Sequence, residues 1–277
     1  MGRALSACGV ALGLTGCLLT GGTQALDAFD ALEPVSVYAV SDTDLSLEWV
    51  DGDNSLAEDS ALWESVLDLL PATYLRGRVV EFQVFSDGPE ETLAYVAKLD
   101  TVADTWVFAL DYVDAAEADE GEWVTTLTHE YAHIVALGGG ELDGEASSCE
   151  RSFAVEEGCA LPHSLLLAWV KRFWPLTLQR EHGALVGHDV ADADGLAEFY
   201  ERYPLDFVNE YAATNPVEDV AESFAYFVFL DDDIDAATRR EHKVRFFYAY
   251  PELVALRSAI RARTPVRRAS IDSDASE

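Results

Sequence analysis

The pentapeptide HEYAH at positions 129–133 constrains this chain more than any other feature of its sequence. Two imidazoles four positions apart reach one metal ion from a helix, where residues i and i+4 share a face. The glutamate between them then lies beside the metal, where it can accept a proton from a bound water molecule. Apolar residues at three-to-four spacing around the motif predict a buried helix over 121–137, which Gly138 would end.

A zinc ion bound by two histidines needs a third protein ligand and keeps a fourth position for water. The extended pattern HExxHxxGxxH is absent, because Ala136 stands at the glycine position and Gly139 at the position of the third histidine. A Met-turn is excluded too, since the chain has a single methionine, Met1. The sequence therefore predicts a carboxylate on a second helix as the third ligand.

Glu218 is the best candidate for this carboxylate. Asn215 is a good N-cap and Pro216 suits the first helical position, so a helix is expected over 216–230 with Glu218 in its first turn. Two interpretations stay open, because a glutamate at this position is also what a capping box uses. Glu222, one turn later on the same face, could accept a hydrogen bond from the far nitrogen of a ligating histidine.

Together, HEYAH and the segment YAATNPVEDVAESF at 211–224 resemble the gluzincin metallopeptidases. They are similar in particular to the catalytic domain of anthrax lethal factor and to the Pro-Pro endopeptidases. The resemblance implies that His129, His133 and Glu218 bind zinc and that Glu130 is the general base. It also implies that Tyr211 stabilises the oxyanion, for which an ordinary packed tyrosine is the alternative.

The resemblance is confined to roughly 30 residues. Asp219-Val220 replaces an aromatic pair of the family pattern, and a segment with two cysteines is not part of that pattern. The resemblance therefore implies a chemistry but no cleavage preference.

The remaining pattern predicts an α+β fold. β-Branched and aromatic runs favour strands, and apolar stripes favour helices. Strands are expected at 35–40, 74–85 and 105–113, and helices at 57–70, 90–99, 161–174, 190–203 and 236–262 in addition to those named above. With the resemblance, this predicts a zincin-like domain over 34–263: a small twisted sheet and the HExxH helix in an N-terminal lobe, and a mainly helical C-terminal lobe.

The N-terminus indicates export. Residues 1–16 have the order of a signal peptide, and Leu14–Cys17 resembles the bacterial lipobox, which predicts lipidation of Cys17. An ordinary secretory signal and a short uncleaved anchor are the alternatives. Residues 17–33 are expected to be a tether, and 264–277 a flexible tail.

Cys149 and Cys159 are predicted to form a local disulfide, as expected in an oxidising compartment. The alternative, a two-cysteine metal site, lacks further ligands at the usual spacing.

The net charge of −33 makes nucleic acid a poor partner. We therefore expect an exported cell-envelope lipoprotein, on the periplasmic or cell-surface side, that meets a peptide or protein substrate and touches the membrane through Cys17. A catalytically idle zincin fold used for binding and a structural lipoprotein are the alternative functions.

Overall fold

The computed structural model describes residues 34–52, 56–88, 92–146, 148–150, 152–187, 193–231, 236–268 and 270–271. The predicted signal peptide, Cys17 and the tether lie outside the described residues. Within the described ranges, no helix is both long and apolar enough to cross a membrane.

The first half of the chain builds a five-stranded sheet. Its strands are β1 (Ser36–Val40), β2 (Leu47–Gly52), β3 (Val79–Phe85), β4 (Ala94–Asp100) and β5 (Thr105–Asp111). Their order is β2-β1-β3-β5-β4, and the pairing is antiparallel except between β3 and β5. β4 is therefore an edge strand.

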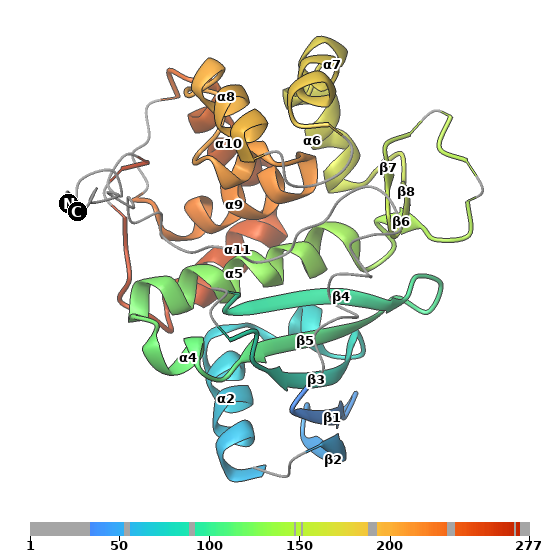
Figure 1. Ribbon diagram of the computed structural model, residues 1–277, viewed down its shortest axis with the longest axis vertical. Coiled ribbons are helices and arrows are strands. Elements are labelled where there is room, and N and C mark those ends of the chain that lie inside the picture. The colour runs from blue at the N-terminus through green and yellow to red at the C-terminus, as the bar shows by residue number, and fades with distance from the viewer. Residues whose placement is uncertain are drawn as a thin grey trace, which may run out of the picture.

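Helices cover this sheet and make up most of the second half. They are α2 (Leu56–Leu69), α3 (Ala72–Leu75), α4 (Asp114–Glu117), α5 (Glu120–Leu137), α6 (Leu165–Phe173), α7 (Leu176–Leu185), α8 (Ala193–Arg202), α9 (Pro216–Phe229), α10 (Arg239–Phe246) and α11 (Pro251–Arg261), with 3-10 turns η1 (Tyr211–Ala213) and η2 (Phe247–Ala249). Figure 1 shows α5 lying beside β4, with α9 on its other side and α7, α8 and α10 farther from the sheet. The predicted α+β class is confirmed.

The core explains why α5 and α9 sit at the centre. Every residue of α5 from Val124 to Leu137, and all of α9, is buried. On the sheet side, Trp63 of α2 packs on Phe82 of β3 with ring centroids 5.0 Å apart. Burial of such large side chains stabilises the fold by roughly 1.5–3 kcal/mol each. The two helices that carry the predicted site are thus part of the hydrophobic core itself.

A second, three-stranded sheet follows α5. It consists of β6 (Leu142–Asp143), β7 (Ala154–Val155) and β8 (Gly158–Ala160), in the order β6-β8-β7. The disulfide between Cys149 and Cys159 is formed, which confirms that prediction.

The helix expected at 90–99 is wrong, because Ala94–Asp100 is strand β4. Its residues pair antiparallel with β5 from Ala94 opposite Leu110 to Asp100 opposite Thr105. The local pattern favoured a helix, but pairing with the neighbouring strand satisfies the backbone and decides the structure.

The single helix expected at 236–262 is also wrong. It divides into α10, η2 and α11, because Pro251 has no N–H to donate and begins a new helix. The start of the predicted tail belongs to the folded body. Arg268 pairs with Leu230, and Thr264 and Ile271 are buried. The end of that segment lies outside the described residues.

Candidate metal centre

Helix α5 places the HExxH residues in a fully enclosed position. The side chain of Asp119 accepts a hydrogen bond from the Glu122 amide and caps the start of the helix. Gly138 follows its last residue, as predicted, and a Cβ there would lie 2.6 Å from the Ile134 carbonyl oxygen. The helix is thereby fixed at both ends, with the histidines in its second half.

Helix α9 supplies the carboxylates. The side chain of Asn215 accepts hydrogen bonds from the amides of Val217, at 2.8 Å, and Glu218, at 3.1 Å, and Pro216 takes the first helical position. This cap uses the backbone of Glu218, while its side chain extends toward α5. Both carboxylates singled out on this helix, Glu218 and Glu222, are 0 % exposed.

Three ligand atoms from the two helices converge. Nε2 of His129 lies 3.0 Å from Nε2 of His133, and Oε2 of Glu218 lies 3.1 Å and 3.4 Å from these two nitrogens. Ligands that share a tetrahedral zinc ion lie about 3.3 Å apart, since each metal–ligand bond is about 2.0–2.1 Å. The triangle therefore has the size of one face of a zinc coordination shell.

The hydrogen bonding around this triangle also fits a cation. Apart from the two imidazole nitrogens, no described group is placed to donate a hydrogen bond to either carboxylate oxygen of Glu218, although both are buried. Buried polar atoms without partners are costly and rare, so such a convergence calls for a positive charge. Burial disfavours a charged His129, but the carboxylates of Glu222 and Glu218 outweigh burial and hold the pKa of His129 well above its usual value.

A chain of contacts orients His129. Its Nδ1 lies 2.6 Å from Oε1 of Glu222, so a ring that gave up its Nε2 proton to bind a cation would keep the other proton on Nδ1, facing Glu222. Asn209 in turn donates from its amide nitrogen to Oε2 of Glu222 at 2.6 Å. The amide of Ala212, in η1, donates to the Asn209 side-chain oxygen at 2.9 Å.

Glu130 lies between the two histidines and the edge of the sheet. Its Oε2 accepts a hydrogen bond of 3.0 Å from the amide of Val96 in β4, and its Oε1 is buried and accepts none. Burial raises the pKa of Glu130 to about 7, partly offset by His129 and His133. One oxygen is thus held by the strand, while the other is available to a proton.

Tyr211 stands at the start of η1, beside the same helix. Its ring centroid is 5.7 Å from that of His129, and its side chain is half-buried. The structure therefore brings the Tyr211 ring next to His129, at the edge of the candidate metal centre.

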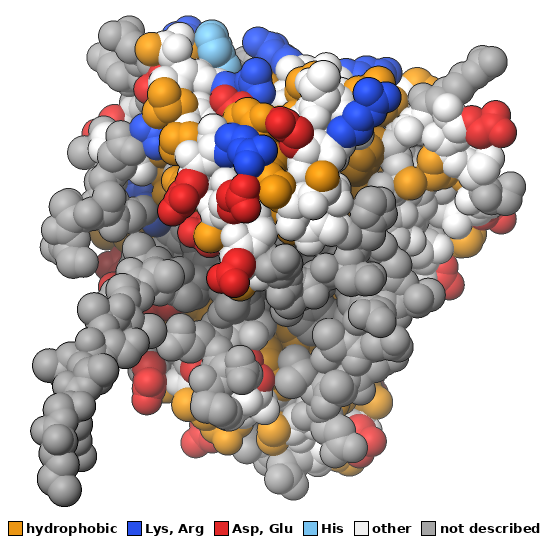
Figure 2. Space-filling view, turned by 45° about the horizontal axis from the view of Figure 1, so that its top comes forward, with side chains coloured by type: hydrophobic (Ala, Val, Ile, Leu, Met, Phe, Trp, Pro, Cys, Tyr) orange, Lys and Arg blue, Asp and Glu red, His pale blue; other side chains and the backbone are white. Residues whose placement is uncertain are grey.

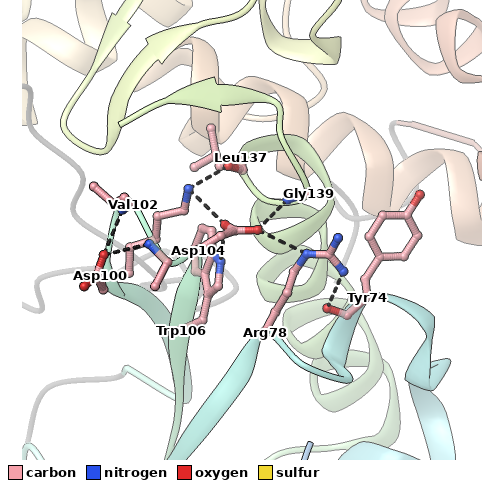
Figure 3. Close-up of polar contacts among 10 residues, drawn as sticks. Tyr74, Arg78, Asp100, Val102, Asp104, Trp106, Leu137 and Gly139 are labelled. Atoms are coloured by element: carbon pink, nitrogen blue, oxygen red, sulfur yellow. Dashed lines mark hydrogen bonds and ion pairs between the residues drawn. The ribbon is translucent and has the colours of Figure 1, made fainter. Parts of the chain in front are cut away.

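The position of β4 against α5 depends on a polar network around Asp104 (Figure 3). Its carboxylate accepts hydrogen bonds from Arg78 Nε at 3.3 Å, from Lys98 Nζ at 3.1 Å and from the Gly139 amide at 2.6 Å. Lys98 also donates to the carbonyl of Leu137, the last residue of α5, at 2.9 Å. The network joins the hairpin that contains β4 to the end of α5 and so supports the contact between Val96 and Glu130.

Asp219, the neighbour of Glu218, belongs to a different cluster. It accepts hydrogen bonds from Trp169 Nε1 at 2.9 Å, from Trp174 Nε1 at 2.7 Å and from Lys243 Nζ at 2.8 Å. Lys243 also lies 3.9 Å from the centre of the Phe207 ring. Burial raises the pKa of Asp219 and lowers that of Lys243, against the attraction between them.

The sequence identified the residues that meet here, namely His129, Glu130, His133, Tyr211, Glu218 and Glu222, and the structure brings them together. It missed Asn209 and Val96. Asn209 precedes a turn and could have been noticed as a turn residue, but its bond to Glu222 has no local signal. The Val96 amide has no local signal either, because only the pairing of β4 with β5 brings it to Glu130.

Comparison with known proteins gives little further information. No protein-family model and no curated protein sequence matches the chain. A crystal structure from Bacteroides caccae, described as a "putative zinc-binding metallo-peptidase", aligns over 77 % of this chain and 82 % of that one, with 15 % identity and a TM-score of 0.37. A likeness of this degree assigns neither a family nor an activity.

Proposed function

We propose that this chain is a zinc-dependent endopeptidase in which His129, His133 and Glu218 hold the metal. The observation that carries the proposal is the triangle of ligand atoms with the buried Glu130 beside it. Zinc bound there would activate a water molecule and polarise the carbonyl of the scissile peptide bond.

The chain's own residues would perform the proton transfers and the positioning. Glu130 accepts the proton of the attacking water through Oε1 and passes it to the leaving amine. Tyr211 donates a hydrogen bond to the developing oxyanion, and loss of one such donor costs roughly 2.7–4 kcal/mol in hydrolases. An extended peptide beside the edge strand β4 would lie next to Glu130.

Metal analysis together with a cleavage screen tests this function. We expect one zinc per chain, hydrolysis of internal peptide bonds in a peptide library read by mass spectrometry, loss of cleavage with a chelator and recovery with added zinc. Zinc without cleavage would indicate a fold used for binding. Failure to take up zinc after reconstitution would reject the site.

We also propose that the protein is exported and anchored by a lipid on Cys17. The lipobox-like sequence carries this proposal, and the disulfide between Cys149 and Cys159 agrees with an oxidising compartment. In a bacterial host, labelled fatty acid should enter the parent and not the Cys17→Ala variant. Equal labelling of both would reject the anchor.

A further inference from the structure

The two faces of the five-stranded sheet bury their side chains in separate clusters. Phe82 and Phe108, which pair across β3 and β5, contact Trp63 of α2 and belong to the main core. The opposite face, called the outer face below, has its own buried cluster. Its members come from β3, β4 and β5 and are 0–4 % exposed, namely Phe85, Tyr95, Val107 and Ala109.

The described part of the chain supplies no apolar layer over the outer face. Among the described residues, Ala97 is the one further apolar side chain packed against this cluster, and it lies in β4 itself. The Phe85 and Tyr95 rings are 5.2 Å apart, and the Tyr95 hydroxyl donates to Oε1 of Gln83 at 3.1 Å, so both contacts lie within the sheet. Large side chains on one face of a sheet are buried only when a second layer packs on them. Their low exposure therefore indicates a cover from outside the described ranges.

One segment is long and apolar enough to be this cover. The internal gaps between the described ranges and the last residues of the chain contain at most six residues each and are mostly polar, as in 89–91, 232–235 and 272–277. The N-terminal segment has 33 residues. Its first 16 are the predicted signal peptide, which leaves 17–33.

The start of β1 lies beside the outer cluster. The amide of Val35 donates to the carbonyl of Val84 at 2.7 Å, and Ser36 pairs with Val84 in the sheet. Phe85 is the next residue of β3. The chain that precedes residue 34 therefore reaches the sheet next to Phe85.

The sequence of 24–33 has the pattern of a helix with one apolar side. Asp27 and Asp30 fall on the opposite side, Thr23 suits the N-cap, and Pro34 favours an end at the residue before it. Ten helical residues are about 15 Å long, and three neighbouring strands span about 10 Å, so this helix could cross the cluster. The apolar side consists of Ala25, Leu26, Ala28, Phe29 and Leu32.

Charge favours a segment of the same chain over a separate copy. Residues 34–150 contain 26 Asp and Glu and only three Lys and Arg. In the face drawn in Figure 2, Lys and Arg side chains gather over the helical end, and the charged side chains visible over the sheet end are acidic. A second copy with a net charge of −33 would be repelled. A segment joined directly to β1 has an effective concentration in the millimolar range and can turn its aspartates to solvent.

We propose that residues 24–33 form an amphipathic helix that docks on the outer face of the sheet, with Phe29 against Phe85 and Tyr95. The segment then belongs to the folded domain and is not a free tether. With the lipid anchor proposed above, only 17–23 would join the docked helix to the membrane, a span of at most about 25 Å. The sheet end would thus be held near the membrane surface.

Hydrogen exchange on the full protein, read by mass spectrometry, tests the docking. An isolated helix of this length is marginal in water, so its amides are protected only when it packs on something. We expect 24–33 to exchange at least about tenfold more slowly than a synthetic peptide of the same sequence. Phe29→Asp should bring the segment to the rate of the free peptide. Asp30→Asn, on the opposite side of the helix, should leave the protection unchanged.

Photo-cross-linking identifies the occupant independently. Benzoylphenylalanine in place of Phe29 should link to β3, β4 or β5 of the same chain, and the same group in place of Asp30 should not. Exchange of 24–33 at the free-peptide rate in the parent, or protection that Phe29→Asp leaves intact, would overturn the proposal. Cross-links between two chains would overturn it as well and assign the outer face to a second copy. Neither measurement requires zinc or cleavage, so the result is independent of the proposed function.

Discussion

Glu218 and Asp219 are neighbours in the first turn of α9, and both are completely buried. Asp219 receives hydrogen bonds from two indoles and an ammonium, so its charge is fully paired within the protein. Glu218 receives none from the described residues and instead faces two imidazole nitrogens. Two adjacent carboxylates thus point into two buried clusters, one fully hydrogen-bonded and the other with atoms that lack partners.

The difference separates structural polar groups from those held ready for a ligand. A cluster that only supports the fold has no reason to leave buried atoms without partners, because each such atom costs about 1–3 kcal/mol. The Asp219 cluster obeys this rule. The Glu218 cluster breaks it at several buried atoms, among them both carboxylate oxygens of Glu218 and one of Glu130, which is the pattern expected of a site that binds a ligand.

The largest effect is expected for chemistry at the unpaired cluster. Glu130→Gln should lower kcat/KM by about 10²–10⁴-fold with zinc content unchanged, since it removes the group that moves the proton. Steady-state kinetics and elemental analysis measure the two quantities. Glu120→Gln, an exposed change at the start of the same helix, is the control. Unaltered turnover in Glu130→Gln would show that Glu130 is not the base.

Asp219→Ala should act on stability. It leaves the buried ammonium of Lys243 without its carboxylate, a change that typically costs about 3–5 kcal/mol. Urea unfolding of the metal-free protein measures this loss. Asp206→Ala breaks a more exposed pair with Arg239, and should cost about 1 kcal/mol or less. Equal losses in the two variants would remove the contrast between a buried paired cluster and the surface.

Glu218→Ala should affect zinc affinity more than stability, in contrast to Asp219→Ala. We expect zinc affinity to fall by more than about 100-fold, because a direct ligand matters more than an outer partner. The free energy of unfolding of the metal-free protein should fall less than in Asp219→Ala, since no accepted hydrogen bond is lost. Competition with a chelator and urea unfolding give both values. Unchanged zinc affinity in the variant would mean that Glu218 is only a residue of the first helical turn and not a metal ligand.

The smallest effect is expected one step further from the metal. Asn209→Ala removes the donor that holds Glu222, and should weaken zinc binding by about tenfold, at the lower end of what outer-shell partners contribute. Gln179→Ala removes a hydrogen bond from the side-chain amide of Gln179 to the Trp174 carbonyl, away from α5, and should leave zinc binding unchanged. If both variants bind zinc equally well, the Asn209–Glu222 contact does not orient His129.

Local signals account for what could be predicted. The HExxH spacing, the Gly138 stop and the cap formed by Asn215 and Pro216 each depend on residues a few positions apart, so α5 and α9 were found with near-correct bounds. The meeting of their side chains followed from metal-ligand chemistry. The local pattern at 90–99 predicts a helix where strand β4 lies, because this segment's structure depends on pairing with β5.

Contacts between distant segments could not be predicted from local pattern. The partners of Asp219 and the amide of Val96 that binds Glu130 come from elements separated by tens of residues. Nothing within one helical turn of these residues distinguishes them from ordinary core or turn positions. Long-range packing decides their roles, and it appears only in the assembled fold.

The division of the centre between α5 and α9 has a consequence for synthesis. Roughly 85 residues separate His133 from Glu218, so a growing chain makes both histidines well before the carboxylate exists. A chain that crosses a membrane unfolded would carry no assembled centre on the side where it is made. The order of the polypeptide itself would then keep the two sets of side chains apart until the whole domain has been made and has folded.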